Sequence, residues 1–308
     1  MPSLQHQLFM LSAQNLGRAV SKDLKRIDTL RWLLEQSTLP FALPKGISLE
    51  SLTVYGMDAE WVIPEQANRS RAILFLHGGG YTVGSLQTHR AMVAKLALEA
   101  GIAALSIDYR LAPEHRFPAA LEDALHGYQW LLEKGYDPSH ITLVGDSAGG
   151  GLVMSTLLTL RELEIPFPQA VCMMSPWLDL TFSAPSAQLY AEDDPIVTVS
   201  DVMPWASAYG GDYDLKHPMI SPLFGDLKGL PPIFVQVSDH EVLTDDSMRL
   251  DAKVREVGGQ IEVQVWEGML HVWQLFWRYI PEGQQALQEM AAFIKSPSLR
   301  PVSSKQEK

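Results

Sequence analysis

The chain has 308 residues, of which 46% are hydrophobic and 19% are charged, and its formal net charge is −12 at pH 7. This composition excludes a wholly disordered chain and allows a large core. The negative charge argues against nucleic acids and anionic membrane surfaces as partners, because both are bound by basic side chains. The only cysteine, Cys172, excludes an intramolecular disulfide and a cysteine-based zinc site.

The first residues show neither a targeting pattern nor a membrane span. Residues 1–11 have no basic region before their apolar residues and no small-residue cleavage pattern. No uninterrupted apolar stretch reaches the roughly 18 residues of a transmembrane helix. We therefore expect a cytoplasmic protein that does not insert into membranes.

Two leucine-rich runs predict helices within residues 1–45. Leu4, Leu8 and Leu11 are spaced i, i+4 and i+7, and residues 24–34 repeat a similar spacing. This region contains no strand pattern. We interpret it as an appendage whose apolar faces pack on the domain that follows.

From residue 52 onward, short apolar runs predict strands, most of which alternate with helices. The predicted strands are 52–55, 60–63, 72–76, 102–107, 141–144, 170–174, 233–237 and 261–265. The predicted helices are 88–100, 118–134, 149–163 and 245–257. Continuous apolar runs are typical of strands that are buried on both faces. The alternation therefore predicts an α/β fold with a mostly parallel central sheet and helices on both faces.

Segment 181–210 is acidic and then aromatic, and it interrupts this alternation. We interpret it as an insertion. The patterns divide the chain into N-terminal helices, a core in two parts, the insertion and a frayed tail. Their boundaries are 1–45 for the helices, 46–180 and 211–298 for the core, 181–210 for the insertion and 299–308 for the tail.

Ser147 is the candidate nucleophile. It is the middle residue of Gly145-Asp146-Ser147-Ala148-Gly149, which follows the predicted strand 141–144 and opens a helical pattern. A tight turn between a strand and a helix is the context in which G-x-S-x-G projects a reactive serine hydroxyl. The helix N-terminus below it favours developing negative charge. The alternative is a glycine-rich turn with an incidental serine.

A second glycine-rich turn, His77-Gly78-Gly79-Gly80, follows the predicted strand 72–76. Successive glycines leave backbone N–H groups accessible, and these can stabilise an oxyanion together with the N–H of Ala148. A flexible loop and a phosphate-binding turn are the alternatives. The phosphate-binding reading lacks both the G-x-G-x-x-G spacing and the G-K-[ST] ending.

His271 is the candidate base, because it lies on the loop after the last predicted strand, in the chain order Ser, acid, His. The acid is expected after strand 233–237, where Asp239 and Glu241 can each supply a fixed negative charge. Asp245 and Asp246 open the next predicted helix. We interpret them as residues that complement the helix dipole.

These residues resemble the hormone-sensitive-lipase-like branch of the α/β-hydrolases over roughly residues 50 to 295. The motifs that carry the resemblance are His77-Gly78-Gly79-Gly80, Asp108-Tyr109-Arg110-Leu111-Ala112-Pro113-Glu114, Phe117-Pro118-Ala119-Ala120, Gly145-Asp146-Ser147-Ala148-Gly149-Gly150, Ser175-Pro176-Trp177-Leu178-Asp179-Leu180 and Gly268-Met269-Leu270-His271.

The resemblance implies an α/β-hydrolase fold and a carboxylic ester hydrolase with no metal or organic cofactor. It implies a helical cap built from the N-terminal segment and the insertion. It also implies Gly79, Gly80 and Ala148 as the oxyanion donors. We interpret the block 109–114 as scaffold, in which Arg110 and Glu114 could pair beneath the site.

The sequence departs from the family at the acid. Members usually carry an Asp, then Pro-Leu, any residue, and an Asp that opens the next helix. Laid on residues 241–245, this pattern puts Glu241 at the acid position and leaves Asp239 two residues too early. We favour Glu241, and Asp239 stays as the alternative.

The hypothesis is therefore a serine carboxylesterase that uses Ser147, His271 and Glu241 and acts on short- to medium-chain esters through an acyl-enzyme. An amidase or lactonase with the same residues is the first alternative. A ligand-binding homologue without catalysis is the second, although such homologues lack the histidine that is present here as His271. A small-molecule ester is the expected partner. A homodimer is compatible with this reading, although no residue pattern specifies it.

Overall fold

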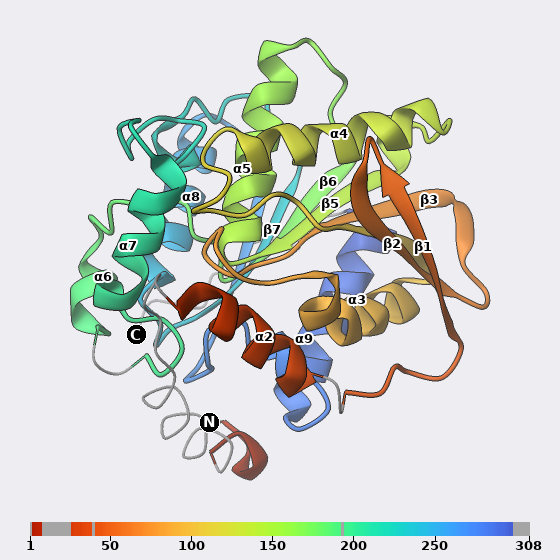
Figure 1. The fold of residues 1–308 in the computed structure, drawn as a ribbon, viewed down its shortest axis with the longest axis horizontal. Helices are drawn as coiled ribbons and strands as arrows, with labels where there is room; N and C mark the ends of the chain where they lie inside the picture. The colour runs from red at the N-terminus through yellow and green to blue at the C-terminus, as the bar shows by residue number, and fades with distance from the viewer. Residues whose placement is uncertain (1, 8–25, 39–40, 192–193, 298–308) are drawn as a thin grey trace.

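The computed structural model describes residues 2–7, 26–38, 41–191 and 194–297 (Figure 1). Leu8, Leu11 and the predicted tail 299–308 lie outside the described residues. None of the helices in the described ranges combines the length and the apolar character that a bilayer span requires.

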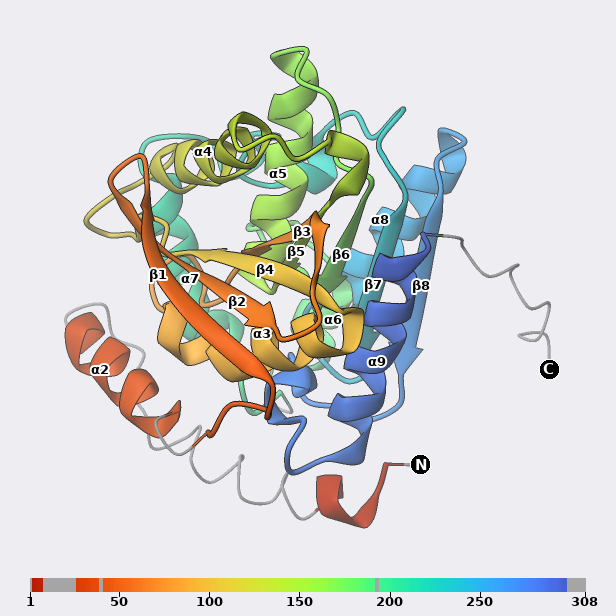
Figure 2. The same cartoon turned by 90° about the vertical axis from the view of Figure 1, so that its right-hand side faces the viewer.

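A twisted sheet forms the centre of the described structure (Figures 1 and 2). Its strands are β1 (Ile47–Val54), β2 (Met57–Pro64), β3 (Asn68–Leu76), β4 (Ile102–Ile107), β5 (Ile141–Asp146), β6 (Ala170–Met174), β7 (Ile233–Ser238) and β8 (Ile261–Trp266). The order across the sheet is β1-β2-β4-β3-β5-β6-β7-β8. The pairs β1–β2 and β2–β4 are antiparallel, and all other neighbours are parallel.

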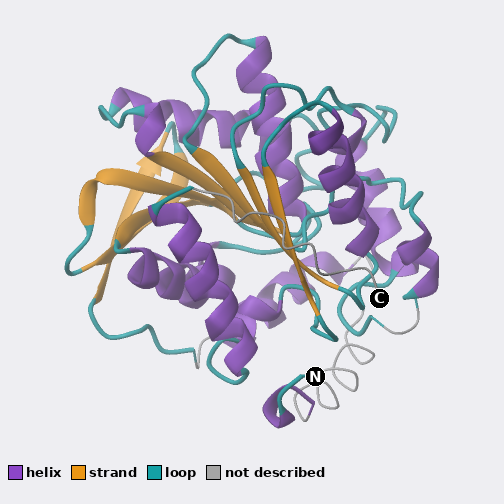
Figure 3. Cartoon of the chain, turned by 180° about the vertical axis from the view of Figure 1, so that it is seen from behind, coloured by secondary structure: helices purple, strands orange, loops and turns teal. Residues whose placement is uncertain are grey.

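Helices cover both faces of this sheet, as the view from behind also shows (Figure 3). They are α2 (Ile27–Thr38), α3 (Leu86–Ala100), α4 (Ala119–Glu133), α5 (Ala148–Glu162), α6 (Pro185–Leu189), α7 (Val199–Gly210), α8 (Thr244–Glu256) and α9 (Pro281–Lys295). Helices α3 and α9 pack on one face, and α4, α5 and α8 pack on the other. The prediction of a mostly parallel sheet with helices on both faces is confirmed.

The side chains of β3 show how one strand builds both cores. Ile73 and Phe75 belong to the cluster that contains α3 and α9, whereas Leu74 and Leu76 belong to the cluster on the opposite face. All four are at most 1% exposed. Because successive strand side chains point to opposite faces, a strand between two helix layers must be apolar at every position.

The N-terminal leucines pack less completely than the sequence predicts. In α2, Leu30 is buried and Leu34 packs against the core, but the side chain of Leu33 is 43% exposed. Leu4 is 68% exposed. The expectation that this region packs through all its leucines is therefore wrong for Leu4 and Leu33.

The predicted pairing of Arg110 with Glu114 is also wrong. Glu114 pairs with Arg31 of α2 at 2.7 Å. Arg110 instead contacts two carboxylates of α4, Glu122 and Asp123, at 2.9 Å each. Asp123 also accepts the backbone N–H of Arg110 at 2.8 Å, so this carboxylate fixes both the main chain and the side chain.

Asp123→Asn is expected to destabilise the fold by about 2 kcal/mol, because Asp123 is 5% exposed and the change weakens several charge-assisted hydrogen bonds. Glu122→Gln is the matched control, since the Glu122 side chain is 51% exposed and such a pair contributes about 0.5 kcal/mol or less. Urea unfolding measures both. Equal losses in the two variants would contradict this assignment.

Candidate active site

Ser147 lies at the turn between β5 and α5 and has φ 51° and ψ −121°. The turn is tight because neighbouring backbones approach closely: a Cβ on Gly145 would overlap the Gly149 carbonyl, and a Cβ on Gly149 would overlap the Leu76 carbonyl. The N–H of Ser147 donates to Met174 O at the end of β6, at 2.8 Å. The two glycines therefore permit a backbone conformation that presents the serine hydroxyl above the strand ends.

His271 follows β8 through the turn at Gly268, and its Nε2 lies 3.0 Å from Ser147 Oγ. It is 5% exposed. The next residue, Val272, has φ 50° and donates its N–H to Ser175 Oγ at 3.2 Å. The loop after β6 thus fixes the backbone beside the imidazole.

Glu241 completes the line of side chains, with its Oε2 3.1 Å from His271 Nδ1 and no exposed surface. A carboxylate can only accept, so Nδ1 carries the proton and donates it to Glu241. The neutral ring then presents Nε2 as the acceptor for the Ser147 hydroxyl. The alternative acid, Asp239, binds the Gly268 N–H at 2.6 Å and the His240 ring at 2.8 Å instead.

Burial and charge act against each other on the His271 pKa. Burial alone would lower it, but the hydrogen bond that His271 donates to Glu241 and the negative charge of Glu241 outweigh burial, and the pKa lies above the ordinary value of 6.5. Burial raises the pKa of Glu241, and the hydrogen bond with His271 offsets part of that rise. Glu241 therefore stabilises the imidazolium form of His271 relative to a free imidazole.

The turn after β3 lies next to the turn that carries Ser147, because the Gly78 N–H donates to Asp146 Oδ1. Gly79 has φ 117° and Gly80 has φ 59°, in the left-handed region that favours glycine. A Cβ on Gly80 would lie 2.5 Å from Cε3 of Trp205 in α7. Among the hydrogen bonds of the described residues, none uses the N–H of Gly79, Gly80 or Ala148.

Asp146 joins this turn to the turn that carries Ser147. Its Oδ1 accepts the Gly78 N–H at 3.0 Å, and its Oδ2 lies 3.2 Å from His89 Nε2. The His77 ring stacks on Tyr109, whose hydroxyl donates to His77 O at 2.6 Å. Burial and then the nearby His89 lower the pKa of His77 to about 3, so His77 is neutral and serves as a packed ring.

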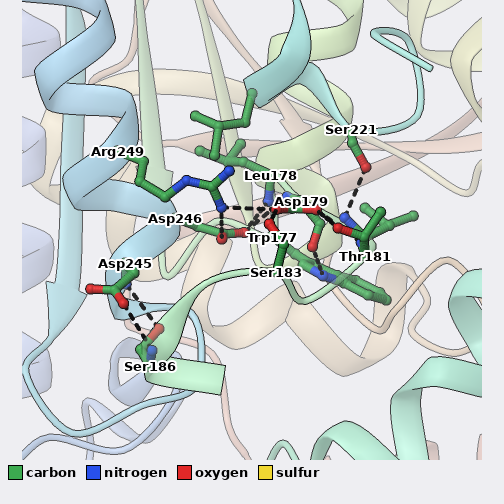
Figure 4. A network of polar contacts seen from close by, with 12 residues as sticks. Trp177, Leu178, Asp179, Thr181, Ser183, Ser186, Ser221, Asp245, Asp246 and Arg249 are labelled. Carbon is green, nitrogen blue, oxygen red and sulfur yellow. Dashed lines mark hydrogen bonds and ion pairs between the residues drawn. The ribbon is translucent and has the colours of Figure 1, made fainter. Parts of the chain in front are cut away.

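A polar network holds the loop after β6 against α8 (Figure 4). Asp246 Oδ2 accepts the N–H groups of Leu178 at 2.8 Å and Asp179 at 2.9 Å. Arg249 donates to Asp179 at 2.8 Å. Burial raises the pKa of Asp246 to about 7. The interpretation of Asp245 and Asp246 as dipole residues alone is therefore incomplete, because Asp246 fixes the loop after β6 and Asp245 accepts the N–H of Ser186 in α6.

Sequence reasoning missed Arg31 and Asp146, which position the glycine turn. Arg31 donates from α2 to Thr82 O at 2.8 Å and Ala112 O at 2.9 Å. Asp146 comes directly before Ser147 in the sequence, and this position could have indicated that its side chain lies close to the site. For Arg31, no sequence pattern indicates its contacts with Thr82 and Ala112, because these residues lie far from it along the chain. In the described ranges, no group of three or more His, Cys, Asp or Glu side chains is arranged to hold a metal ion.

Comparisons with known proteins place this chain in a family. A family model of the alpha/beta hydrolase fold matches residues 73–275. An acetyl-hydrolase of Streptomyces hygroscopicus is 40% identical over 245 residues, which are 80% of this chain and 82% of that protein. An esterase of Acinetobacter venetianus is 34% identical over 273 residues, or 88% and 90% of the two chains.

A crystal structure of an esterase from the bacterial hormone-sensitive lipase family superposes with a TM-score of 0.91 at 40% identity, covering 96% of this chain and 99% of that one. The chain belongs to the hormone-sensitive-lipase-like family of α/β-hydrolases. This esterase is a carboxylic ester hydrolase, as the resemblance predicts.

Gly80→Ala is expected to lower ester hydrolysis at least about tenfold, because the new methyl group would meet the Trp205 ring and shift the turn. Gly229→Ala is the control, since Gly229 also has a positive φ, 72°, but a Cβ there meets nothing within 4 Å. Its cost is about 1 kcal/mol of stability without loss of activity. Steady-state kinetics and thermal melts measure both, and unchanged activity of Gly80→Ala would contradict this description of the turn.

Proposed function

We propose that this esterase hydrolyses esters through an acyl-enzyme on Ser147, with His271 as general base and acid and Glu241 as the orienting carboxylate. The proposal rests on His271, whose ring nitrogens lie 3.0 Å from Ser147 Oγ and 3.1 Å from Glu241 Oε2. A nucleophile in contact with a base, itself held by a buried carboxylate, is the arrangement that acyl transfer requires.

In the first half-reaction, Ser147 Oγ attacks the ester carbonyl carbon while its proton passes to His271 Nε2. The imidazolium then gives this proton to the leaving oxygen, the C–O bond breaks, and the alcohol departs. In the second half-reaction, His271 takes a proton from water, whose oxygen attacks the acyl carbon. Return of the proton to Ser147 Oγ releases the carboxylic acid.

We propose the N–H groups of Gly79, Gly80 and Ala148 as donors to the oxyanion of each tetrahedral intermediate. Ala148 is the first residue of α5, so the positive end of the helix dipole adds to its N–H. Fixed backbone donors need no reorganisation when charge develops on the substrate oxygen.

We further propose that the described parts of residues 1–45 and of the insertion 181–210 form a cap over the site, and that this cap limits acyl length. In the insertion, Trp205 is 5% exposed and its ring borders Gly80. Each buried CH₂ of substrate gains about 0.8 kcal/mol only while there is room for it. The acetyl-hydrolase relative supports a small acyl group as substrate.

Ser147→Ala is expected to lower kcat by about 10⁴ or more, because no other group can form the acyl-enzyme. The exposed Ser139 provides the control, and Ser139→Ala should keep full activity. Hydrolysis of p-nitrophenyl butyrate measures both, with circular dichroism to show that each variant folds. Substantial turnover by Ser147→Ala would overturn the mechanism.

Glu241→Gln is expected to cost about 10⁴ in kcat, because an amide no longer stabilises the imidazolium or the required tautomer. Asp239→Asn keeps an oxygen that can accept the Gly268 N–H, and should cost less than about tenfold. The kcat of the two variants decides between the acids. Loss of activity with Asp239 and its survival without Glu241 would reverse the assignment.

Acyl chains of about four to eight carbons are expected to be the best substrates, with a steep fall by about twelve, because the gain per CH₂ ends where the pocket ends. A series of p-nitrophenyl esters measures kcat/KM against chain length. Trp205→Ala should move the optimum to longer chains, since it removes the ring beside Gly80. A flat profile to about sixteen carbons would contradict the proposed cap.

A further inference from the structure

The insertion contacts the backbone of the loop that carries Glu241. Val242, the residue after Glu241, makes one hydrogen bond to the insertion through its N–H and another through its carbonyl. We propose that Asp194 of the insertion is a positioning residue of the active site, which fixes the Glu241 loop and sets the pH range in which His271 acts as a base. This inference rests on the proposed roles of Ser147, His271 and Glu241.

The side chain of Asp194 links two segments. It is 1% exposed, and its Oδ1 accepts the N–H groups of Ile196 and Val197 at 2.9 Å each. Its Oδ2 accepts the N–H of Val242 at 3.3 Å. One carboxylate thus closes a turn of the insertion and binds the peptide group directly after Glu241.

Ser186 holds the same residue, Val242, through its carbonyl, which belongs to the next peptide group. Its Oγ donates to Val242 O at 2.8 Å, and its N–H donates to Asp245 Oδ2 at 2.8 Å. Figure 4 shows the contact between Ser186 and Asp245. Val242, the residue next to Glu241, is therefore hydrogen-bonded to the insertion through both its N–H and its carbonyl. Movement of this loop would change the contact between Glu241 and His271.

The charge of Asp194 also acts on the catalytic pair. After burial and the hydrogen bond with Glu241, the negative charges that raise the pKa of His271 are those of Glu241, Asp194 and Asp146. Asp194 also raises the pKa of Glu241. The three carboxylates that act on the imidazole come from different parts of the chain: the loop after β7, the insertion and the end of β5. Of the three, Glu241 is the one that is hydrogen-bonded to the ring.

The turn alone does not require a charged residue at position 194. Asn forms the same turn through its side-chain oxygen. An amide would then present its NH₂ group to the Val242 N–H, which is also a donor, and would supply no negative charge. A buried carboxylate is costly to place, so the hydrogen bond of Asp194 to the Glu241 loop and the effect of its charge on His271 indicate a role beyond the turn.

The test compares pH profiles of kcat/KM for the wild type, Asp194→Asn and Asp194→Glu. Loss of the negative charge lowers the His271 pKa, so the acid limb of Asp194→Asn should move to lower pH by about 0.5 unit. Its kcat at the optimum should fall about tenfold with little change in KM. Asp194→Glu keeps the negative charge, so the acid limb of its kcat/KM profile should stay at the same pH as in the wild type. Asp201→Asn, whose carboxylate bonds Thr198 at the start of α7, is the control and should keep the wild-type profile.

A lower kcat/KM at every pH with an unmoved acid limb would overturn the inference and leave Asp194 with a structural role only. If Asp194→Asn does not fold, Asp194→Ser carries the same expectation, because its hydroxyl can still accept a turn N–H. Ser147→Ala serves as the separate test of the proposed function. An inactive Ser147→Ala together with an unmoved limb in the Asp194 variants refutes this inference alone.

Discussion

Ser147 has φ 51° and ψ −121°, a conformation that an L-residue rarely adopts and that surrounding contacts must hold in place. Gly145 and Gly149 allow the close approach of backbones that this turn needs, and β6 accepts its N–H. The glycine turn after β3 is joined to the same turn through Asp146. The parts of the site therefore depend on how tightly β3, β5 and β6 meet at their carboxyl ends.

Much of the fold could be predicted because each buried strand is a continuous apolar run. The sequence located the eight strands and the helices α2, α3, α4, α5 and α8, and their order implied a mostly parallel sheet. It missed α9, whose amphipathic pattern was not assigned to an element. It also expected Leu4 and Leu33 to be packed, although both are exposed, because periodicity shows an apolar face but not what covers it.

The parts of the candidate site that lie in short sequence motifs could be predicted. Ser147 and His271 stand in recognisable local contexts at strand ends. The acid was ambiguous, since Asp239 and Glu241 are two residues apart, and only the three-dimensional path of the loop brings Glu241 rather than Asp239 to the imidazole. Contacts between distant segments, such as those of Arg31 and Asp194, have no local signal, because they depend on how the N-terminal helix and the insertion pack.

Trapping of the covalent intermediate tests the central claim most directly. The esterase is mixed with a p-nitrophenyl ester, quenched with acid in the first turnover, digested and analysed by mass spectrometry. The account predicts a burst of about one nitrophenol per chain and an acyl group on the peptide that contains Ser147. Turnover without a burst and with no acyl group on Ser147, or with the group on another residue, would contradict it.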